Sequence, residues 1–478
     1  MKLLLIDPPG DARGVSIGLA YVATSAKCNG HEVKVLNLNN DYEMLPTKKL
    51  KRMVMTFKPD VIGFTIMCHT YNIALSLIAD LRNYYHRPVI IGGVQVAVDQ
   101  EQILIRSPGT DYVMVGEAED SINLFLDAIK RRSGFENVPG LIFRKKNKIM
   151  KSRIPKGFIN DLNTTPIPDY GLFGIKQMDN YLMITSRGCP FNCIYCFHDH
   201  ERTWRKQSVD KTIKEIKIAI EKYKSKTFVI VDQCFNLNVK YVEEFCDKLI
   251  AEKLKISWVA NGIRADRLPL YLVKKMKQAG CIKVILGIET LVPEVFKNIK
   301  KGEQIKDIIK SVQTLKKCGI RVKGNFIIGL PGDTYSRTME NFKKARSLKL
   351  DEESWAVLLP MPGTEVFNWA KTDPSVRNYA TYKEVDMVWS PTLGIDVAFD
   401  TLDFTREERL KAYKIITTKT RRYMINPKHN PLINFFKVMR DVLKYDPWRF
   451  FYHLSLIFTD LIPIYFKGVY TRNVKYQD

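Results

Sequence analysis

The chain has 478 residues, more than the roughly 250 to 300 at which a single hydrophobic core usually stops growing, so two or three domains are expected. Nine cysteines do not make the dense framework of a secreted disulfide scaffold, and the N-terminus lacks a signal-peptide pattern, so we expect a cytoplasmic protein. The net charge of +24 permits a nucleic acid or an anionic membrane surface as partner, but it also suits a solvated basic surface. No window reaches the about 18 uninterrupted apolar residues of a spanning helix, which argues against an integral membrane protein.

Residues 1–150 show the pattern of an α/β domain with a parallel sheet. Short apolar runs from KLLLID to DYVMVGE alternate with segments long enough for helices, and a hairpin is expected over 139–150. Ligands of such sheets bind beyond the carboxyl ends of the strands. Small or polar residues occupy those ends: Asp7, Gly92, Gly93, Gly116 and Glu117. A Pro-containing linker is expected over 151–180.

Residues 181–375 repeat the strand-helix alternation six times, which predicts a partial (β/α)6 barrel and not a closed eightfold one. The strands are expected at 182–188, 228–233, 257–262, 283–289, 324–331 and 354–362. Chemistry in barrels of this kind takes place at the carboxyl ends of the strands. We therefore look for functional residues at the strand ends of this domain.

The last segment, residues 376–478, is basic and rich in aromatic residues, and we expect it to be mainly α-helical. Two interpretations stay open. Short helices broken at Pro447 and Pro463 could lie at a membrane interface, or they could pack on the barrel. The aromatic residues that would enter the interface are Phe435, Phe436, Trp448, Phe450, Phe451 and Phe458.

Three cysteines lie within eight residues of one another, just after the first expected strand of the barrel. Cys189, Cys193 and Cys196 have the spacing C-x3-C-x2-C, so one loop can turn all three sulfurs toward one metal centre. Zinc would need a fourth ligand, such as His198 or His200, and would be structural. A [4Fe-4S] cluster held by three cysteines would keep one iron open to an exogenous ligand.

The cysteine motif, with an aromatic Tyr195 before its last cysteine, resembles the signature of the radical S-adenosylmethionine (SAM) superfamily. The runs VDQCFNLN, GIET, NFIIGLPGDT and PMPGTEVF resemble its later strand ends, so the resemblance covers about 180–370. It implies a [4Fe-4S] cluster on Cys189, Cys193 and Cys196, whose open iron would bind SAM. It also implies that the following residues contact SAM or the substrate: Phe197, Asp232, Gln233, Arg264, Glu289, Ile327 and Pro331.

The N-terminal domain resembles the Rossmann-like cobalamin-binding domain of class B radical SAM methyltransferases and anaerobic cyclases. LLLIDPP, GLAYVATSAKCNGHEVKVLNLN, IGGVQVAV and DYVMVGEAED carry this resemblance. It implies that Asp7, Gly92, Gly93, Gly116 and Glu117 contact cobalamin. The D-x-H-x-x-G pattern of an axial histidine is absent from the sequence, and we expect His69 to be a packing or loop residue. The resemblance then implies either cobalamin without a histidine ligand from the protein or a domain that keeps the fold without the cofactor.

The resemblance implies a cobalamin-dependent radical SAM enzyme that generates a 5′-deoxyadenosyl radical. Such an enzyme would methylate or cyclise an unactivated carbon, and the aromatic C-terminal segment favours a lipid-like or tetrapyrrole substrate. An electron donor of the flavodoxin or ferredoxin type and peripheral contact with the membrane's inner face are further expectations, and no nucleic acid is expected. The alternatives are an RNA-modifying methylthiotransferase, which shares the barrel, and a zinc-dependent nucleic-acid-binding protein.

Overall fold

The structure is a computed structural model. It describes residues 1–10, 14–38, 46–146, 148–153, 159–197, 202–377, 379, 397–420, 436, 439–440, 442–444 and 474–476. The chain divides into two compact units. The first unit comprises Met1–Met178 and Val474–Asp478, and the second comprises Asp179–Asn473.

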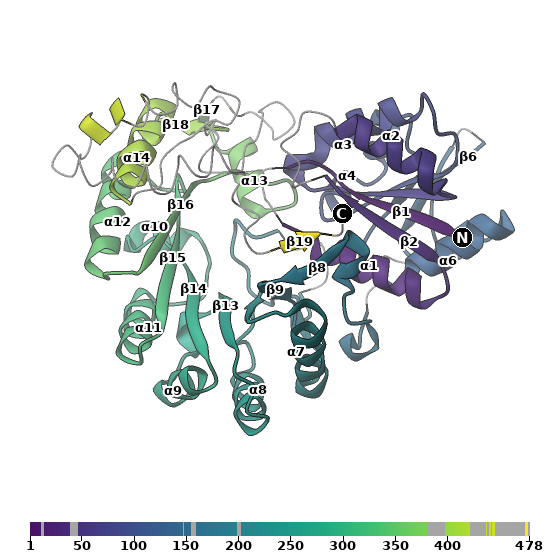
Figure 1. The fold of residues 1–478 in the computed structure, drawn as a ribbon. Coiled ribbons are helices and arrows are strands. Elements are labelled where there is room, and N and C mark those ends of the chain that lie inside the picture. The colour runs from purple at the N-terminus through teal and green to yellow at the C-terminus, as the bar shows by residue number, and fades with distance from the viewer. Residues whose placement is uncertain are drawn as a thin grey trace. The chain divides into compact units, whose positions relative to one another are not determined.

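The first unit contains a seven-stranded sheet in the order β2-β1-β3-β4-β5-β6-β7 (Figure 1). Its strands are β1 (Lys2–Asp7), β2 (Glu32–Asn37), β3 (Val61–Thr65), β4 (Val89–Gly92), β5 (Tyr112–Met114), β6 (Leu141–Lys145) and β7 (Lys148–Lys151). The first five are parallel, and the expected hairpin appears as the antiparallel pair β6 and β7. The strand order 2-1-3-4-5 is that of a doubly wound fold.

Helices cover both faces of this sheet, with α2 and α3 on one side and α1 and α6 on the other (Figure 1). The helices are α1 (Ile17–Cys28), α2 (Pro46–Phe57), α3 (Tyr71–Leu81), α4 (Val96–Asp99), α5 (Gln102–Arg106) and α6 (Ser121–Arg131). Leu3, Leu4, Leu5 and Ile6 in β1 are almost completely buried, as expected of a strand covered on both faces. The Ser16 hydroxyl accepts the N–H of Leu19 and so caps α1.

The second unit contains a six-stranded, wholly parallel sheet in the order β16-β15-β14-β13-β12-β9. Its strands are β9 (Asn180–Met183), β12 (Thr227–Ile230), β13 (Ser257–Ile263), β14 (Cys281–Glu289), β15 (Arg321–Ile328) and β16 (Glu352–Val357). Within the described part of the chain, no pairing joins β9 to β16, so the sheet is an open arc and the partial barrel is confirmed.

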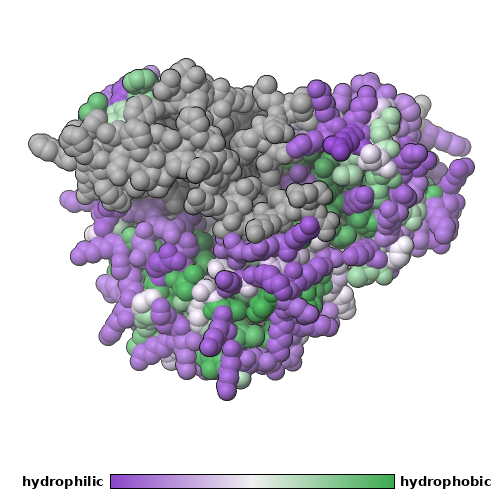
Figure 2. All heavy atoms as spheres, in the orientation of Figure 1, coloured by the Kyte–Doolittle hydropathy of each residue, from purple (hydrophilic) through white to green (hydrophobic). Residues whose placement is uncertain are grey.

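Helices lie along the outer side of this arc (Figure 1). They include α7 (Val209–Tyr223), α8 (Val239–Ala251), α9 (Leu270–Gln278), α10 (Pro293–Asn298), α11 (Ile305–Lys317) and α12 (Tyr335–Ser347). The last helix of the series, α13 (Glu365–Thr372), lies beyond the end of β16 (Figure 1). Their buried side chains recur at helical spacing, as Ile308, Val312 and Leu315 do in α11. On the face shown in Figure 2, hydrophilic side chains extend from much of the described surface, with smaller hydrophobic areas between them.

The first barrel strand is shorter than the sequence predicts. It was expected over 182–188, but β9 ends at Met183, and a short strand β10 (Ser186–Arg187) pairs antiparallel with β11 (Arg205–Lys206) instead. The physical reason is the buried carboxylate of Asp232, which accepts hydrogen bonds from Thr185 and Ser186 and draws this segment out of the sheet.

The C-terminal segment is described only in part. It includes β17 (Val376–Arg377), β18 (Asp400–Thr401) and α14 (Arg406–Lys419), and β19 (Val474–Tyr476) pairs with β8 (Ile175–Met178) of the first unit. Phe436 is exposed, whereas Phe435, Trp448, Phe450, Phe451 and Phe458 lie outside the described residues. None of the helices in the described ranges is long and apolar enough to cross a membrane.

Candidate functional site

The three clustered cysteines lie on the loop that leaves β9 at the carboxyl end of the second sheet. Cys189 and Cys193 are half-buried, and Cys196 is exposed. Gly188, just before the loop, has a φ of +88°, and a Cβ there would lie 2.1 Å from the carbonyl oxygen of Thr203. Glycine is therefore required where the two ends of the cysteine loop pass each other.

The loop is fixed by backbone and aromatic contacts on both sides of Cys193. The N–H of Ile194 donates to the carbonyl of Ile299 (3.2 Å), and its carbonyl accepts the N–H of Val366 (2.9 Å). Phe197, a predicted SAM contact, packs on Gly363, where a Cβ would lie 2.7 Å from the ring. These contacts connect the cysteine loop to segments that follow β14 and β16.

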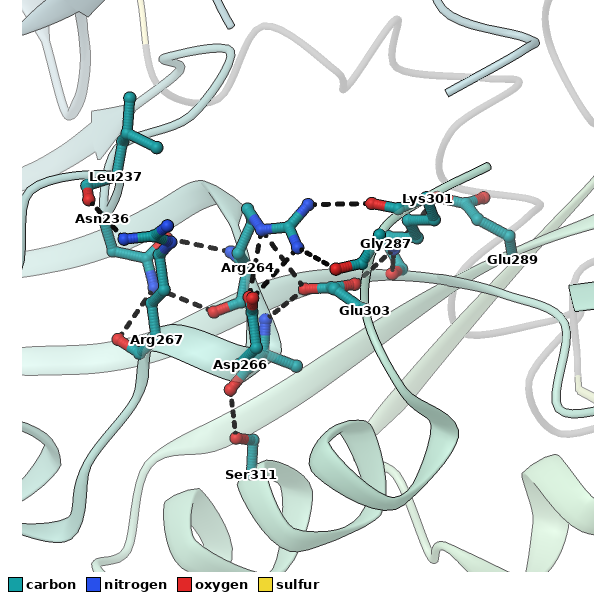
Figure 3. Close-up of polar contacts among 12 residues, drawn as sticks. Asn236, Leu237, Arg264, Asp266, Arg267, Gly287, Glu289, Lys301, Glu303 and Ser311 are labelled. Carbon is teal, nitrogen blue, oxygen red and sulfur yellow. Dashed lines mark hydrogen bonds and ion pairs between the residues drawn. The ribbon is translucent and has the colours of Figure 1, made fainter. Parts of the chain in front are cut away.

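Arg264 is the main side-chain anchor of this region (Figure 3). Its guanidinium carbon lies 3.5 Å from the centre of the Phe191 ring, which stands between Cys189 and Cys193 in sequence. The same group binds Asp266 through two nitrogens at 3.0 Å. It also donates to the backbone carbonyls of residues 301 and 302, each at 2.9 Å. All these contacts are within the chain, so the structure places Arg264 as a clamp beside the cysteine loop.

A buried network of charges lies next to the clamp (Figure 3). The ammonium of Lys301 is 3.1 Å from a carboxylate oxygen of Glu303 and 3.8 Å from one of Glu289, and it donates to the carbonyl of Gly287. Burial raises the pKa of Glu289. Burial alone would lower the pKa of Lys301, but the two carboxylates outweigh that effect and raise it.

Tyr195 connects this network to the cysteines, since its side chain lowers the pKa of both Glu289 and Cys193. Burial raises the pKa of Tyr195, so the phenol stays protonated and can donate. Glu289 has a φ of +63°, which is uncommon for a residue with a side chain. Strained backbone conformations of this kind are common at functional sites. With this conformation the carboxylate of Glu289 folds back and lies beside Gly287.

Asp232 is buried directly behind the loop, and both of its carboxylate oxygens are used within the chain. One oxygen accepts the N–H of Thr185 (2.7 Å), and the other accepts the hydroxyls of Thr185 and Ser186 (2.6 Å each). Burial raises the pKa of Asp232 to about 6. In this arrangement Asp232 positions the start of the cysteine loop.

The raised pKa of Asp232 predicts a pH dependence of stability. In the unfolded chain the group titrates near 4, so between about pH 4 and 6 the folded state holds more protons, and the free energy of unfolding falls as pH rises, by on the order of 3 kcal/mol. Asp232→Asn should make this decrease smaller, since the amide does not titrate, while the buried Glu215, whose pKa burial raises to about 7, still contributes. Urea unfolding followed by tryptophan fluorescence at several pH values measures it. All six tryptophans lie beyond residue 178, so the signal reports the second unit.

The control for this prediction is Asp247→Asn, which changes a more than half-exposed carboxylate on α8. It should keep the decrease that the unchanged protein shows. An equal decrease in Asp232→Asn and the unchanged protein would contradict the assignment.

The backbone at Gly262 leads to a second prediction about the stability of this unit. Its φ is +67°, and a Cβ there would lie 2.0 Å from the carbonyl oxygen of Asp232. Gly262→Ala should lower the free energy of unfolding by about 2 to 3 kcal/mol, from left-handed strain and the clash together. Gly319→Ala is the control, since it also has a positive φ, but only the end of Lys277 lies near, at 3.7 Å. If urea unfolding shows the same loss of unfolding free energy in both variants, a clash at Gly262 is not the cause.

The remaining predicted contacts lie along the same sheet edge. Gln233 is exposed after β12, while Ile327 at the end of β15 and Pro331 beyond it are half-buried. The carbonyl of Pro331 accepts the side-chain amide of Asn298. In this loop a Cβ on Gly329 would lie 2.4 Å from the guanidinium of the completely buried Arg409 in α14.

Sequence reasoning missed three residues of this site. Lys301 and Glu303 lie in a loop after α10, and only the folded chain brings them to the cysteines. Cys234 follows β12 within the VDQCFNLN run and lowers the pKa of Cys189. The position of Cys234 just after the strand predicted at 228–233 is the sequence feature that could have indicated its place at the site.

The thiols suit an iron-sulfur cluster in their chemistry. The Cys234 thiol lowers the pKa of Cys189 to about 6 and the Cys196 thiol lowers the pKa of Cys193, while Cys193 and burial raise the pKa of Cys196 itself. Thiolates are the form that ligates iron. Among the described residues, no three His, Cys, Asp or Glu side chains converge on a single-ion position. His198 and His200, the expected zinc ligands, lie outside those residues.

The five candidate residues of the first unit lie together at the carboxyl edge of its sheet. The buried carboxylate of Asp7 accepts the N–H of Ser16 at 3.3 Å, and burial raises the pKa of Asp7 to about 7. Glu117 accepts the N–H of Ile159 at 2.8 Å. Gly92 is the last residue of β4, Gly93 follows it, and Gly116 lies beyond β5; Gly93 and Gly116 have a positive φ.

The close approach of a neighbouring backbone segment explains why a glycine is needed at position 93. A Cβ on Gly93 would lie 2.5 Å from the carbonyl oxygen of Ile66, which follows β3. A Cβ on Gly10, after β1, would lie 2.9 Å from the ring of His69 and would be equally close to Thr70. His69 belongs to a short 3-10 helix after β3, and burial lowers its pKa. Small residues thus let the strand ends and their loops approach closely at this edge of the sheet.

Family models match both units of the chain. The model of the radical SAM superfamily matches residues 183–345, and the model of the B12 binding domain matches residues 10–126. An uncharacterized methyltransferase of Pyrococcus horikoshii is 29% identical over 409 residues, covering 81% of this chain and 87% of its own. The anaerobic magnesium-protoporphyrin IX monomethyl ester cyclase of Rubrivivax gelatinosus is 25% identical, and the match covers 82% of this chain and 74% of the cyclase.

Solved structures share the fold at low sequence identity. The radical SAM methyltransferase TsrM from Kitasatospora setae, with cobalamin and a [4Fe-4S] cluster bound, has a TM-score of 0.67 and 15% identity, covering 94% of this chain and 89% of its own. The cobalamin-dependent SAM radical enzyme OxsB, with aqua-cobalamin and SAM bound, has a TM-score of 0.69 and 14% identity, covering 99% and 76%. These likenesses confirm the expected α/β fold class.

Proposed function

Because the chain belongs to the radical SAM enzymes that carry a B12-binding domain, we propose that it methylates or cyclises an unactivated carbon atom. The observation that carries the proposal is the cysteine loop itself. It leaves the first strand of an open parallel barrel, and a second, doubly wound unit stands before that barrel in the chain. The B12-binding match at residues 10–126 favours this function over that of an RNA-modifying methylthiotransferase.

In this proposal Cys189, Cys193 and Cys196 hold a [4Fe-4S] cluster as thiolates and leave one iron for SAM. When bound, the cluster and cobalamin would supply the one-electron cleavage of SAM and the carriage of a methyl group. Four of the implied SAM contacts are accessible at the strand ends: Gln233 is exposed, and Phe197, Ile327 and Pro331 are half-buried. We assign contact with SAM or substrate to these four.

Asp232, Arg264 and Glu289 have a different role in the proposal, since their charged groups already bind within the chain. Asp232 holds the start of the loop, Arg264 clamps it through Phe191, and Glu289 connects it to Lys301. Such supporting contacts fix the geometry of ligands that must hold a cofactor in one position. We therefore assign these three as positioning residues.

Asp7, Gly92, Gly93, Gly116 and Glu117 would border cobalamin at the carboxyl edge of the first sheet. The glycines allow the corrin to approach the backbone closely. The carboxylates of Asp7 and Glu117 would hold the surrounding loops in place through their bonds to Ser16 and Ile159.

The substrate in this proposal is a lipid-like molecule or a tetrapyrrole. Two similar proteins support this class by their names, the cyclase of Rubrivivax gelatinosus and the hopanoid C-3 methylase of Methylococcus capsulatus. The basic, aromatic composition of residues 401–478 agrees with delivery of such a substrate from an anionic membrane surface. A flavodoxin- or ferredoxin-type protein would supply the electron.

Product analysis tests the function and separates its two versions. The anaerobic protein, with iron, sulfide and cobalamin restored, is incubated with SAM and dithionite, and the products are measured by mass spectrometry. Formation of methionine and 5′-deoxyadenosine supports a radical SAM enzyme. S-Adenosylhomocysteine in an amount equal to the bound cobalamin indicates methyl transfer, and its absence indicates cyclisation. Absence of both 5′-deoxyadenosine and S-adenosylhomocysteine would overturn the proposal.

A further inference from the structure

A completely buried arginine lies in the C-terminal segment, beyond the six strand-helix units of the barrel. Arg409 belongs to α14 and is 0% exposed. Its helix packs against α12 and β16 of the same unit. A guanidinium that is taken out of water needs partners, because burying a charge is costly. The proposed function gives Arg409 no role, so its burial needs an explanation.

The segment that precedes α14 holds one side of this guanidinium. Nε of Arg409 donates to the carbonyl of Phe404 at 3.1 Å, and Nη2 donates to the hydroxyl of Thr401 at 3.4 Å. The guanidinium carbon lies 4.2 Å from the centre of the Phe399 ring and 4.9 Å from the centre of the Phe404 ring. These contacts fix the direction in which the remaining nitrogen, Nη1, points.

The remaining nitrogen of Arg409 points at the loop that follows β15. Gly329 opens this loop with a φ of +85°, and a Cβ there would overlap with Nη1 and lie 3.0 Å from the guanidinium carbon. Glycine therefore lets the guanidinium lie directly against the backbone. Among the residues that the structure describes, Nη1 has no hydrogen-bond partner. Arg409 thus acts on this loop by packing and by charge.

The buried carboxylate of Asp333 binds the same loop from within. One oxygen accepts the N–H of Gly329 and the hydroxyl of Thr338, each at 2.9 Å, and the other accepts the N–H of Thr334 at 2.9 Å. Burial lowers the pKa of Arg409 to about 10, while the charge of Asp333 acts in the opposite direction, so the guanidinium stays charged at neutral pH. Gly329 therefore lies between a buried cation and a buried carboxylate that both contact it.

We propose that Arg409 is a positioning residue for SAM, which from α14 holds the backbone of residues 329–333 in the conformation that binds SAM. The inference rests on the proposed function, which assigns Ile327 and Pro331, on either side of Gly329, to contact with SAM or substrate. A loop that is fixed before binding spares the ligand the cost of ordering it. The helix α14 of the C-terminal segment is then a working part of the barrel.

Hydrogen–deuterium exchange of the full-length protein tests whether Arg409 holds the loop. Arg409→Met removes the guanidinium and keeps an unbranched apolar side chain. Amides 329–334 should exchange faster in this variant, because the backbone bonds to Asp333 lose their support, whereas β12 should exchange as in the unchanged protein. Lys419→Met, which removes an exposed cation of the same helix, should change neither segment. Unchanged exchange of the loop, or equal acceleration in β12, would overturn the inference.

SAM affinity is the second measurement, on protein with iron, sulfide and cobalamin restored. Equilibrium dialysis without reductant gives the Kd for SAM, and 5′-deoxyadenosine formation with dithionite at several SAM concentrations gives KM and kcat. In Arg409→Met we expect Kd and KM to rise roughly 10-fold, while kcat stays near that of the unchanged protein. A purely structural role would lower kcat through loss of folded enzyme and leave KM unchanged, and that result would overturn the inference.

Arg409→Lys is the second variant, since it keeps a cation but not the planar group that packs on Gly329. It should raise the Kd for SAM less than Arg409→Met does, and it carries the same test if tryptophan fluorescence shows that Arg409→Met is unfolded. Faster exchange of the loop with unchanged SAM affinity would also overturn the inference. Failure of the unchanged protein to bind SAM would count against the proposed function, while the exchange data would still decide whether Arg409 holds the loop.

Discussion

Cys193→Ala is expected to remove the cluster absorbance and to lower SAM cleavage more than about 100-fold, while cobalamin binding stays unchanged. Cys193 is the middle ligand of the proposed set, and alanine offers no replacement donor. Cobalamin would lie in the first unit, at Met1–Met178, whereas the cysteines belong to the second unit. Absorption spectra, extracted corrin and 5′-deoxyadenosine formation measure the three quantities.

The control for this variant is Cys246→Ala, which removes a buried cysteine on α8. It should keep the cluster and the corrin. The tryptophan fluorescence of both variants shows whether the second unit is folded. Loss of corrin from a folded Cys193→Ala protein would contradict the assignment of the two cofactors to separate units.

Lys301→Met is expected to lower the free energy of unfolding of the second unit by about 3 to 5 kcal/mol. The change leaves the buried carboxylate of Glu289 without its cation and leaves Glu303 with only Arg264, whose Nε is 3.9 Å away. Removing one partner of a buried group of charges has this cost. Urea unfolding followed by tryptophan fluorescence measures it. Because Glu289 reaches Cys193 through Tyr195, the variant should also take up less iron and sulfide.

The adjacent Lys300 provides a matched control. Its ammonium pairs with Glu365, but both side chains are more than half exposed, so Lys300→Met should cost about 1 kcal/mol or less. Similar losses in the two variants would mean that Lys301 is not part of a buried network. A large loss in Lys301→Met with normal cluster uptake would limit the network to stability.

The sequence allowed prediction of those parts of the fold and site that depend on local patterns. Apolar runs separated by helix-length segments predicted both parallel sheets, because strand and helix periodicities extend over few residues. The cysteine spacing predicted one loop at one strand end. Asp7, Gly92 and Gly116 were placed at the edge of the first sheet by the same reasoning, and the structure has them there.

The remaining features depend on contacts between distant residues. The run YLMITSRG remains strand-like to its end, yet the chain leaves the sheet after Met183 because Asp232, about 50 positions later, binds Thr185. Lys301 resembles any surface lysine in sequence, and only its burial beside Glu303 gives it a role. Likewise, nothing local predicts that β19, near the C-terminus, pairs with β8 of the first unit.

The most direct test of the central claim is the cofactor content of the protein. Anaerobic purification from cells supplied with cobalamin, followed by restoration of iron and sulfide, allows iron, acid-labile sulfide, zinc and extracted corrin to be measured on one sample. The account predicts one [4Fe-4S] cluster and near-stoichiometric corrin per chain. Zinc without labile sulfide, and no retained corrin, would contradict it.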